Sequence, residues 1–131
     1  MGLIMSISVV TGSIAAGDSM SGVVDRSTSD VVSLIMPAGW NDARLTFQVS
    51  IDGTDFHDVF DQNGHEVQVT VTVNSAIAMP DNYFGRIRFI KFRSGTRDAP
   101  VVQAEQRDMT IVLNDRDAPA SSFYIPIKLV P

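Results

Sequence analysis

Four aspartates recur at every third position in one short stretch: Asp52, Asp55, Asp58 and Asp61, with Asn63 close behind. Carboxylate and amide oxygens are the ligands that calcium prefers, so a calcium loop is one interpretation. The EF-hand pattern is absent, because that loop needs acidic residues two apart and a glutamate at its twelfth position. The alternative is an acidic, solvated hairpin edge whose charges block unwanted strand addition. We expect no metal and no other cofactor.

The two histidines, His57 and His65, flank the turn dipeptide Asn63-Gly64 and could face each other across a hairpin. A histidine base needs an oriented nucleophile beside it, and no G-x-S-x-G elbow is present. The chain also has no cysteine, which excludes a thiolate nucleophile, cysteine metal sites and disulfides. We therefore expect two exposed histidines and no enzymatic activity.

Trp40 is the single tryptophan and follows Pro37-Ala38-Gly39 between two expected strands. An exposed indole in a loop stacks on sugars or inserts into a partner protein, which makes this loop a possible ligand site. A lone tryptophan also caps the end of a hydrophobic core with its ring buried. Both alternatives are open on the sequence.

The basic residues are concentrated in the second part of the chain. Up to Gly85 there are ten acidic and two basic residues, and from Arg86 onward there are eight basic and five acidic ones. Such polarity suits head-to-tail contact with a neighbour, unless the two parts interleave in the fold. The net charge of −5 argues against non-specific binding to nucleic acid. We expect a protein contact through one basic segment: Arg86, Arg88, Lys91, Arg93 and Arg97.

Period-two alternation of apolar and polar residues indicates strands as the elements that hold these groups. The clearest stretch predicts five inward side chains, Ala43, Leu45, Phe47, Val49 and Ile51, and four outward ones, Arg44, Thr46, Gln48 and Ser50. Asp52-Gly53 then favours a hairpin turn. Further strands are expected at Leu3 to Val10, Val31 to Met36, His57 to Phe60, His65 to Val73, Arg86 to Arg93, Asp108 to Leu113 (with Met109, Ile111 and Leu113 inward) and Phe123 to Leu129.

Three local features refine this pattern. Val31 to Met36 is apolar on both parities, which predicts a central strand covered on both faces. The alternation in Arg86 to Arg93 slips by one residue, which predicts a β-bulge near Phe89 and Ile90. Helical periodicity is weak everywhere, and its best candidate is a turn or two at Asn74 to Asp81.

The sequence therefore predicts an all-β, single-domain antiparallel β-sandwich of the jelly-roll or galactose-binding-like type over residues 1–113. Residues 114–131 are expected to be an extension or arm that packs on a neighbour or on the domain edge. Pro126 and Pro131 cannot donate to a ladder, so its last strand is expected at an edge. The interface residues expected in the arm are Phe123, Tyr124, Ile125 and Ile127. The longest apolar run is too short to cross a bilayer, so we expect no membrane partner.

Two blocks of the sequence carry a family resemblance. "LIMPAGWNDARLTFQVSIDGTDFHDVFDQNGHEVQVTV" and "FGRIRFIKFRSGTRDAPVVQAEQRDMTIVL" resemble, in the same order, a group of small structural proteins of tailed bacteriophages. The first block also has a weaker likeness to galactose-binding-like, discoidin-type sandwiches. Together the two blocks lie within residues 31–113.

The phage resemblance implies a non-enzymatic virion protein, made in the cytoplasm of an infected bacterium. The function expected first is capsid decoration, with the major capsid protein and copies of itself as partners and no nucleic acid. The alternatives are a head-tail connector or neck component, a tail or spike accessory protein, and a receptor- or glycan-binding module that uses Trp40.

Overall fold

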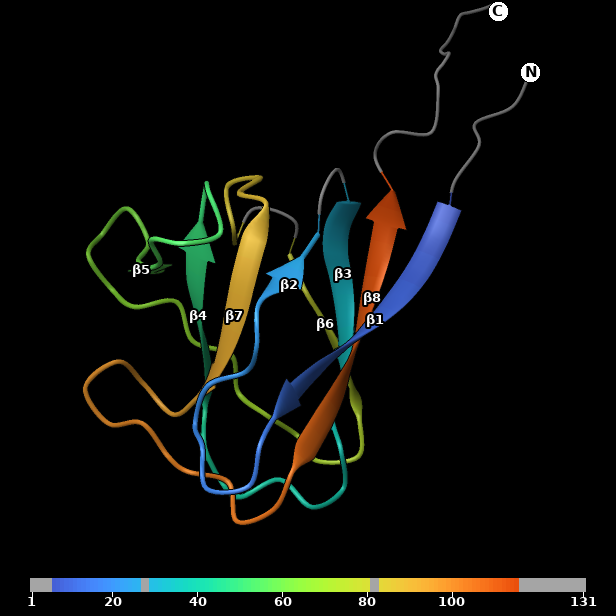
Figure 1. Cartoon of the computed structure of the whole chain (residues 1–131), viewed down its shortest axis with the longest axis vertical. Coiled ribbons are helices and arrows are strands. Elements are labelled where there is room, and N and C mark those ends of the chain that lie inside the picture. Colours follow the sequence, from blue (N-terminus) through green and yellow to red (C-terminus); the bar gives the residue numbers. More distant parts are fainter. Residues whose placement is uncertain (1–5, 27–28, 81–82, 116–131) are drawn as a thin grey trace, which may run out of the picture.

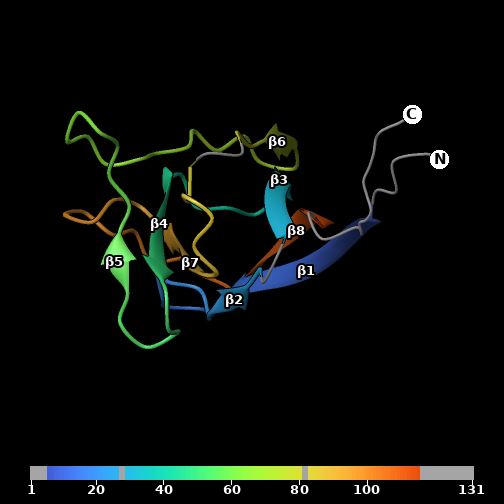
Figure 2. The same ribbon diagram turned by 90° about the horizontal axis from the view of Figure 1, so that it is seen from above.

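The computed structural model describes residues 6–26, 29–80 and 83–115, and this part of the chain forms eight strands and no helix. Two antiparallel four-stranded sheets pack face to face, which confirms the predicted β-sandwich (Figures 1 and 2). Sheet A has the order β1-β8-β3-β6, and sheet B has the order β2-β7-β4-β5. The strands are β1 (Ser6–Ile14), β2 (Val24–Asp25), β3 (Ser29–Ile35), β4 (Leu45–Ser50), β5 (His57–Asp58), β6 (Ala76–Ala78), β7 (Phe89–Ser94) and β8 (Arg107–Asp115).

The core lies between the two sheets. From sheet A, Met109, Ile111 and Leu113 point inward as predicted, and all three are buried. From sheet B, Phe47 on β4 and Phe92 on β7 are directly opposite each other in the ladder, with their ring centroids 5.5 Å apart in an edge-to-face arrangement. Such aromatic pairs add stabilisation beyond the area they bury.

The strand at β4 is in the predicted phase, but the prediction of its exposure was wrong at three places: Ile51, Thr46 and Ser50, which was expected in solvent and is 1% exposed. Leu45, Phe47 and Val49 are buried as expected. Ile51 is 85% exposed, because the strand ends at Ser50 and the Asp52-Gly53 turn takes Ile51 away from the core. Thr46 was expected in solvent and is fully buried, because later segments of the chain cover the outer face of sheet B at this point.

The predicted bulge at Phe89 and Ile90 was wrong, because β7 pairs with β4 in continuous register from Phe89 to Ser94. The slip in alternation has another cause: β7 begins only at Phe89, after a turn in which Gly85 and Arg86 both have positive φ.

The bulge lies in β3 instead, where the register with β8 shifts between Val31 and Ser33 and leaves Val32 as the extra residue. This shift explains why Val31 to Met36 is apolar on both parities. The strand is central as predicted, but its outward-facing Ile35 is exposed, so the expectation of cover on both faces was wrong.

Both turn dipeptides make turns in which the glycine has positive φ. The pairing after Asn63-Gly64 is shorter than predicted: β5 comprises only His57–Asp58, and one isolated bridge joins Phe60 to Glu66. Residues 67–73 keep alternating burial but form no strand, and Val69 alone bridges to β4. The helical turn expected after residue 73 is wrong, because β6 occupies Ala76–Ala78.

The two ends of the described chain meet at the same end of sheet A, where Ser6 of β1 pairs with Asp115 of β8 (Figure 1). Strand β8 therefore runs two residues beyond the expected domain boundary at residue 113. The predicted interface residues of the arm lie outside the described residues: Phe123, Tyr124, Ile125 and Ile127.

Candidate functional site

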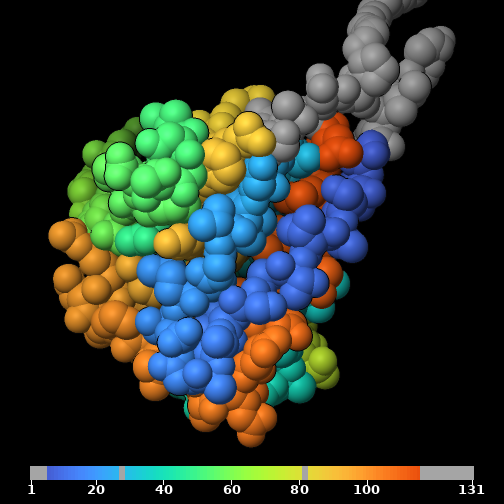
Figure 3. All heavy atoms as spheres, viewed as in Figure 1, coloured from blue at the N-terminus to red at the C-terminus, as the bar shows by residue number. Residues whose placement is uncertain are grey.

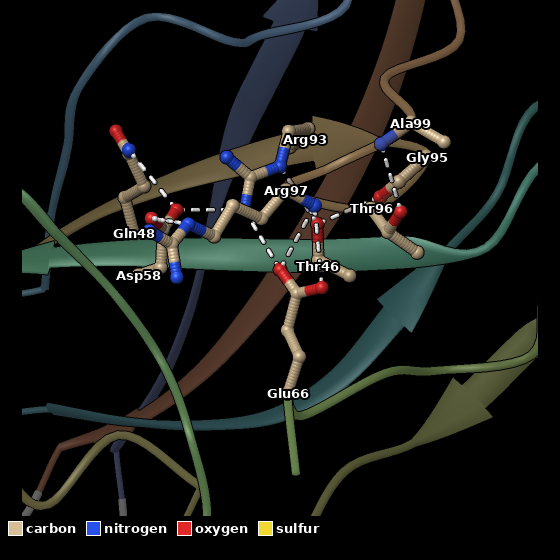
Figure 4. Close-up of polar contacts among 9 residues, drawn as sticks. All are labelled: Thr46, Gln48, Asp58, Glu66, Arg93, Gly95, Thr96, Arg97 and Ala99. Carbon is tan, nitrogen blue, oxygen red and sulfur yellow. Dashed lines mark hydrogen bonds and ion pairs between the residues drawn. The ribbon is translucent and has the colours of Figure 1, made fainter. Parts of the chain in front are cut away.

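The polar residues that could do chemistry converge on the outer face of sheet B, around Arg93 of β7. Arg93 is only 5% exposed although it is charged. Its Nε donates to Thr46 Oγ1 on β4 at 2.9 Å, and its Nη2 donates to Asp58 at 2.8 Å and to Glu66 at 2.9 Å (Figure 4). We call this group the Arg93 cluster; its members are Thr46, Gln48, Asp58, Glu66, Arg93 and Arg97.

Each carboxylate in the Arg93 cluster has more than one partner. Asp58 accepts a hydrogen bond from Gln48 Nε2 at 3.2 Å and lies 3.5 Å from Arg97 Nε. Burial would raise the pKa of Asp58, but the hydrogen bonds from Arg93 and Gln48 and the two guanidinium charges outweigh it and lower that pKa. Glu66 also accepts from the backbone N–H of Arg97 at 3.1 Å. The two acids and two bases balance in charge.

This arrangement joins segments that are far apart in sequence. Thr46 Oγ1 donates a hydrogen bond to the carbonyl of Gly95 at 2.7 Å and accepts one from Arg93, so the hydroxyl is both donor and acceptor. Strands β4 and β7, the hairpin after β5 and the loop after β7 are thereby held together over one face. A carboxylate held between a guanidinium and a backbone N–H is poorly placed as a nucleophile or general base. The Arg93 cluster therefore holds the loops against sheet B.

A surface hollow of about 700 Å³ lies beside the Arg93 cluster, and Glu66 belongs to both. Its other lining residues come mostly from the hairpin turn and the segment that follows: Arg44, Phe60, Asp61, Gln62, Asn63, Val67, Gln68 and Tyr83. The hollow combines polar amide and carboxylate groups with two aromatic side chains.

The predicted acidic loop does not come together as a metal site. Asp52 accepts from the backbone N–H groups of Asp55 and Thr54, which together with Ser50 lower its pKa to about 2. Asp61 likewise accepts hydrogen bonds from the backbone N–H groups of Asn63 and His65. Asp58 belongs to the Arg93 cluster. In the ranges that the structure describes, no three acidic or histidine side chains lie close enough to hold an ion.

The two histidines do not form a reactive pair. Both are exposed, and His65 Nδ1 lies 3.9 Å from Asp61 of the same turn.

The predicted basic segment does not form a single stripe, because its members point in different directions. Arg93 is internal, so it is a structural residue in this fold rather than a contact residue. Arg88 makes a two-pronged ion pair with Asp25 at 2.8 and 2.9 Å. Lys91 lies over the ring of Phe56 at 4.4 Å from the centroid, and Arg97 faces Asp58. For Arg86, Arg88, Lys91 and Arg97 a role in an interface stays a prediction.

Trp40 is 6% exposed, and its Nε1 donates to the carbonyl of Ala43 at 3.1 Å. Burial favours the core-cap alternative, because a sugar needs an accessible ring face. The residue that fixes the neighbouring loops is Gln103, which sequence patterns did not single out. It is fully buried and bonds Asn41, Ser94 and Arg107.

Exposed large apolar side chains occur on sheet A and on several connecting segments of the described chain. On sheet A, Ile7 is 59% and Val9 62% exposed, and Ile35 on β3 is also exposed on the same outer face. Phe60 is exposed on the loop 59–68 and Val102 on the loop 95–106, and Val23, Ile51 and Val73 are exposed on other connecting segments. Figure 3 shows the atoms of β1 at the surface of the molecule. Apolar surface of this kind marks sites of protein contact when it is contiguous.

Comparison of the chain with protein-family models, curated proteins and solved structures finds no match in any of the three. Within the described residues no helix could span a membrane.

Proposed function

We propose that the chain is a non-enzymatic structural protein of a tailed-phage virion, and specifically a decoration protein that binds coat subunits on the capsid. The observation that carries this proposal is that apolar side chains are exposed at separate places on one sandwich, Ile7 and Val9 on β1 and Phe60 and Val102 on the loops 59–68 and 95–106. A protein that bridges two subunits needs two such regions in fixed relative positions.

The Arg93 cluster supports the same proposal, because it fixes the loop 59–68, which contains Phe60, against sheet B. Rigid spacing matters for a bridging protein. When one contact is made, the second becomes intramolecular, and its effective concentration rises only if the geometry permits both contacts. Weak single contacts then give stable coating of a particle on which many copies bind.

The test is uptake by particles. Heads of the virus that encodes the chain, made without it, should bind the purified protein to saturation and resist heating better afterwards. Val102→Asp should weaken uptake, because it places a charge in an apolar contact. Thr72→Asp, at an exposed position outside both regions, is the matched control and should bind normally. Failure of the wild-type protein to bind heads would contradict the proposal, and binding to tails or necks alone would favour the connector or tail alternative.

A further inference from the structure

Strand β1 is the one long edge among the described strands. The other edges of the two sheets are β6, β2 and β5, with three, two and two residues, whereas β1 has nine. Its sequence, SISVVTGSI, contains no charge and no proline, and its register with β8 runs without a bulge from Ser6 to Ile14. Edge strands are normally protected by shortness, charge, proline or a bulge, and β1 has none of these. An unprotected edge accepts an added strand.

The direction of the backbone groups of β1 follows from one hydrogen bond. Gly22 N–H donates to the carbonyl of Ser13 at 3.4 Å, on the side of β1 away from β8. Backbone groups alternate in direction along a strand, so those of Ile7, Val9 and Thr11 also face the open edge. Among the described residues none of these three has a backbone partner on that side. Their side chains lie on the outer face of sheet A, where Val9 is opposite Val112.

The chain itself contains a segment that fits this edge. In residues 123–129, Phe123, Ile125, Ile127 and Leu129 alternate with polar residues and with Pro126. If these four odd-numbered residues direct their backbone groups to β1, their side chains lie beside Ile7 and Val9 on the outer face. Pro126 then faces away, where its missing N–H costs nothing and prevents addition of a further strand.

We propose that residues 123–129 of a second copy add to the edge of β1 as an antiparallel strand. The chain's own tail is badly placed, since Asp115 and Ser6 are opposite each other at the same end of sheet A. To reach the open edge directly it would have to pass around the start of β1 and run parallel to β1, whereas all pairs among the described strands are antiparallel. Eight residues from Asp115 to Phe123 extend about 26 Å, which is enough to reach a neighbouring domain. This inference does not depend on the proposed function.

The test is self-association of the full chain in solution, measured by sedimentation. Ile127→Pro removes a donor that the added strand needs, whereas Lys128→Pro changes a position that faces away and is its matched control. Val9→Lys places a charge on the receiving strand, with Ile51→Lys as its control at an exposed position in the turn after β4. Ile127→Pro and Val9→Lys should each weaken association at least about tenfold, and the two controls should leave it unchanged.

Mixing the two defective variants separates exchange between copies from pairing within a chain. The Val9→Lys protein keeps an unchanged segment 123–129, and the Ile127→Pro protein keeps an unchanged β1. The mixture should therefore form a heterodimer under conditions in which each variant alone is monomeric. The proposal is overturned if the wild-type chain stays monomeric throughout the micromolar range, if controls and variants associate equally, or if the mixture remains monomeric. Far-ultraviolet circular dichroism of each variant shows that it is folded, and particles are not needed, so this test can fail without contradicting the decoration proposal.

Discussion

The outer faces of the two sheets are built in opposite ways. On sheet B the outer face is covered, and it buries Arg93 and Thr46 under the hairpin that follows β5. On sheet A the outer face is bare, and it exposes Ile7, Val9 and Ile35. The polar face is thus closed within the domain and the apolar face is open. Polar groups that complete each other's hydrogen bonds stabilise one chain, whereas uncovered apolar groups are stabilised by a partner.

The largest expected effect comes from opening the covered face at its centre. Arg93→Met leaves Asp58 and Glu66 partly buried without their shared cation, and loss of one partner of a buried pair costs about 3–5 kcal/mol. Urea unfolding followed by fluorescence of Trp40 measures the change. The control is Arg88→Met, which breaks an exposed pair with Asp25 and should lower the free energy of unfolding far less. Equal losses in the two variants would show that the Arg93 cluster is no more important than a surface pair.

An intermediate effect is expected from a single hydroxyl. Thr46→Val keeps the shape of the side chain but leaves Arg93 Nε and the Gly95 carbonyl without a partner. A buried group left unsatisfied costs about 1–3 kcal/mol. The same substitution at Thr11, exposed on the bare face, should change the free energy of unfolding by less than about 0.5 kcal/mol. Similar values at both positions in urea titrations would remove the contrast between the two faces.

The smallest expected effect is a pH dependence. The pKa of Asp58 is lower in the folded protein than in the unfolded chain, so acidification protonates the unfolded chain first and favours unfolding. Its contribution is complete above the ordinary aspartate value of about 3.9 and is lost as pH falls below it. Stability of Asp58→Asn should therefore fall less steeply than that of the wild type between neutral and acidic pH. Asp52 and Asp61 retain part of the slope, because their pKa values are lowered as well. An unchanged slope in Asp58→Asn would contradict the assigned role of Asp58.

Local patterns predicted the local structure well. Alternation gave the inward residues of β4 and β8, and Asp52-Gly53 and Asn63-Gly64 gave two turns, because each depends on residues next to one another. The shift at Val32 and the late start of β7 were missed, since a slip in alternation has the same appearance for a bulge and for a turn.

The contents of the site were less predictable, because they depend on contacts between distant segments. Arg93 and Thr46 have the pattern of solvent-facing strand residues, and they are internal because the distant segments that carry Asp58, Glu66 and Gly95 cover them. From the sequence alone, a buried Arg93 paired with two acidic residues could not be distinguished from an Arg93 that is part of a basic surface stripe. A strand that contains Ile7 and Val9 was expected. That this strand lies at an unprotected edge could not be predicted, because it depends on which strands pair.

Hydrogen–deuterium exchange of the full chain, recorded at low and at high protein concentration, tests the contrast between the two faces most directly. We predict slow exchange at both concentrations for β4 and β7 under the Arg93 cluster. For Ile7, Val9 and Thr11 we predict fast exchange at low concentration and protection at high concentration. Protection of β1 that is equal at both concentrations, or rapid exchange of β4, would contradict the view that sheet B is closed within the chain and sheet A is open to a partner.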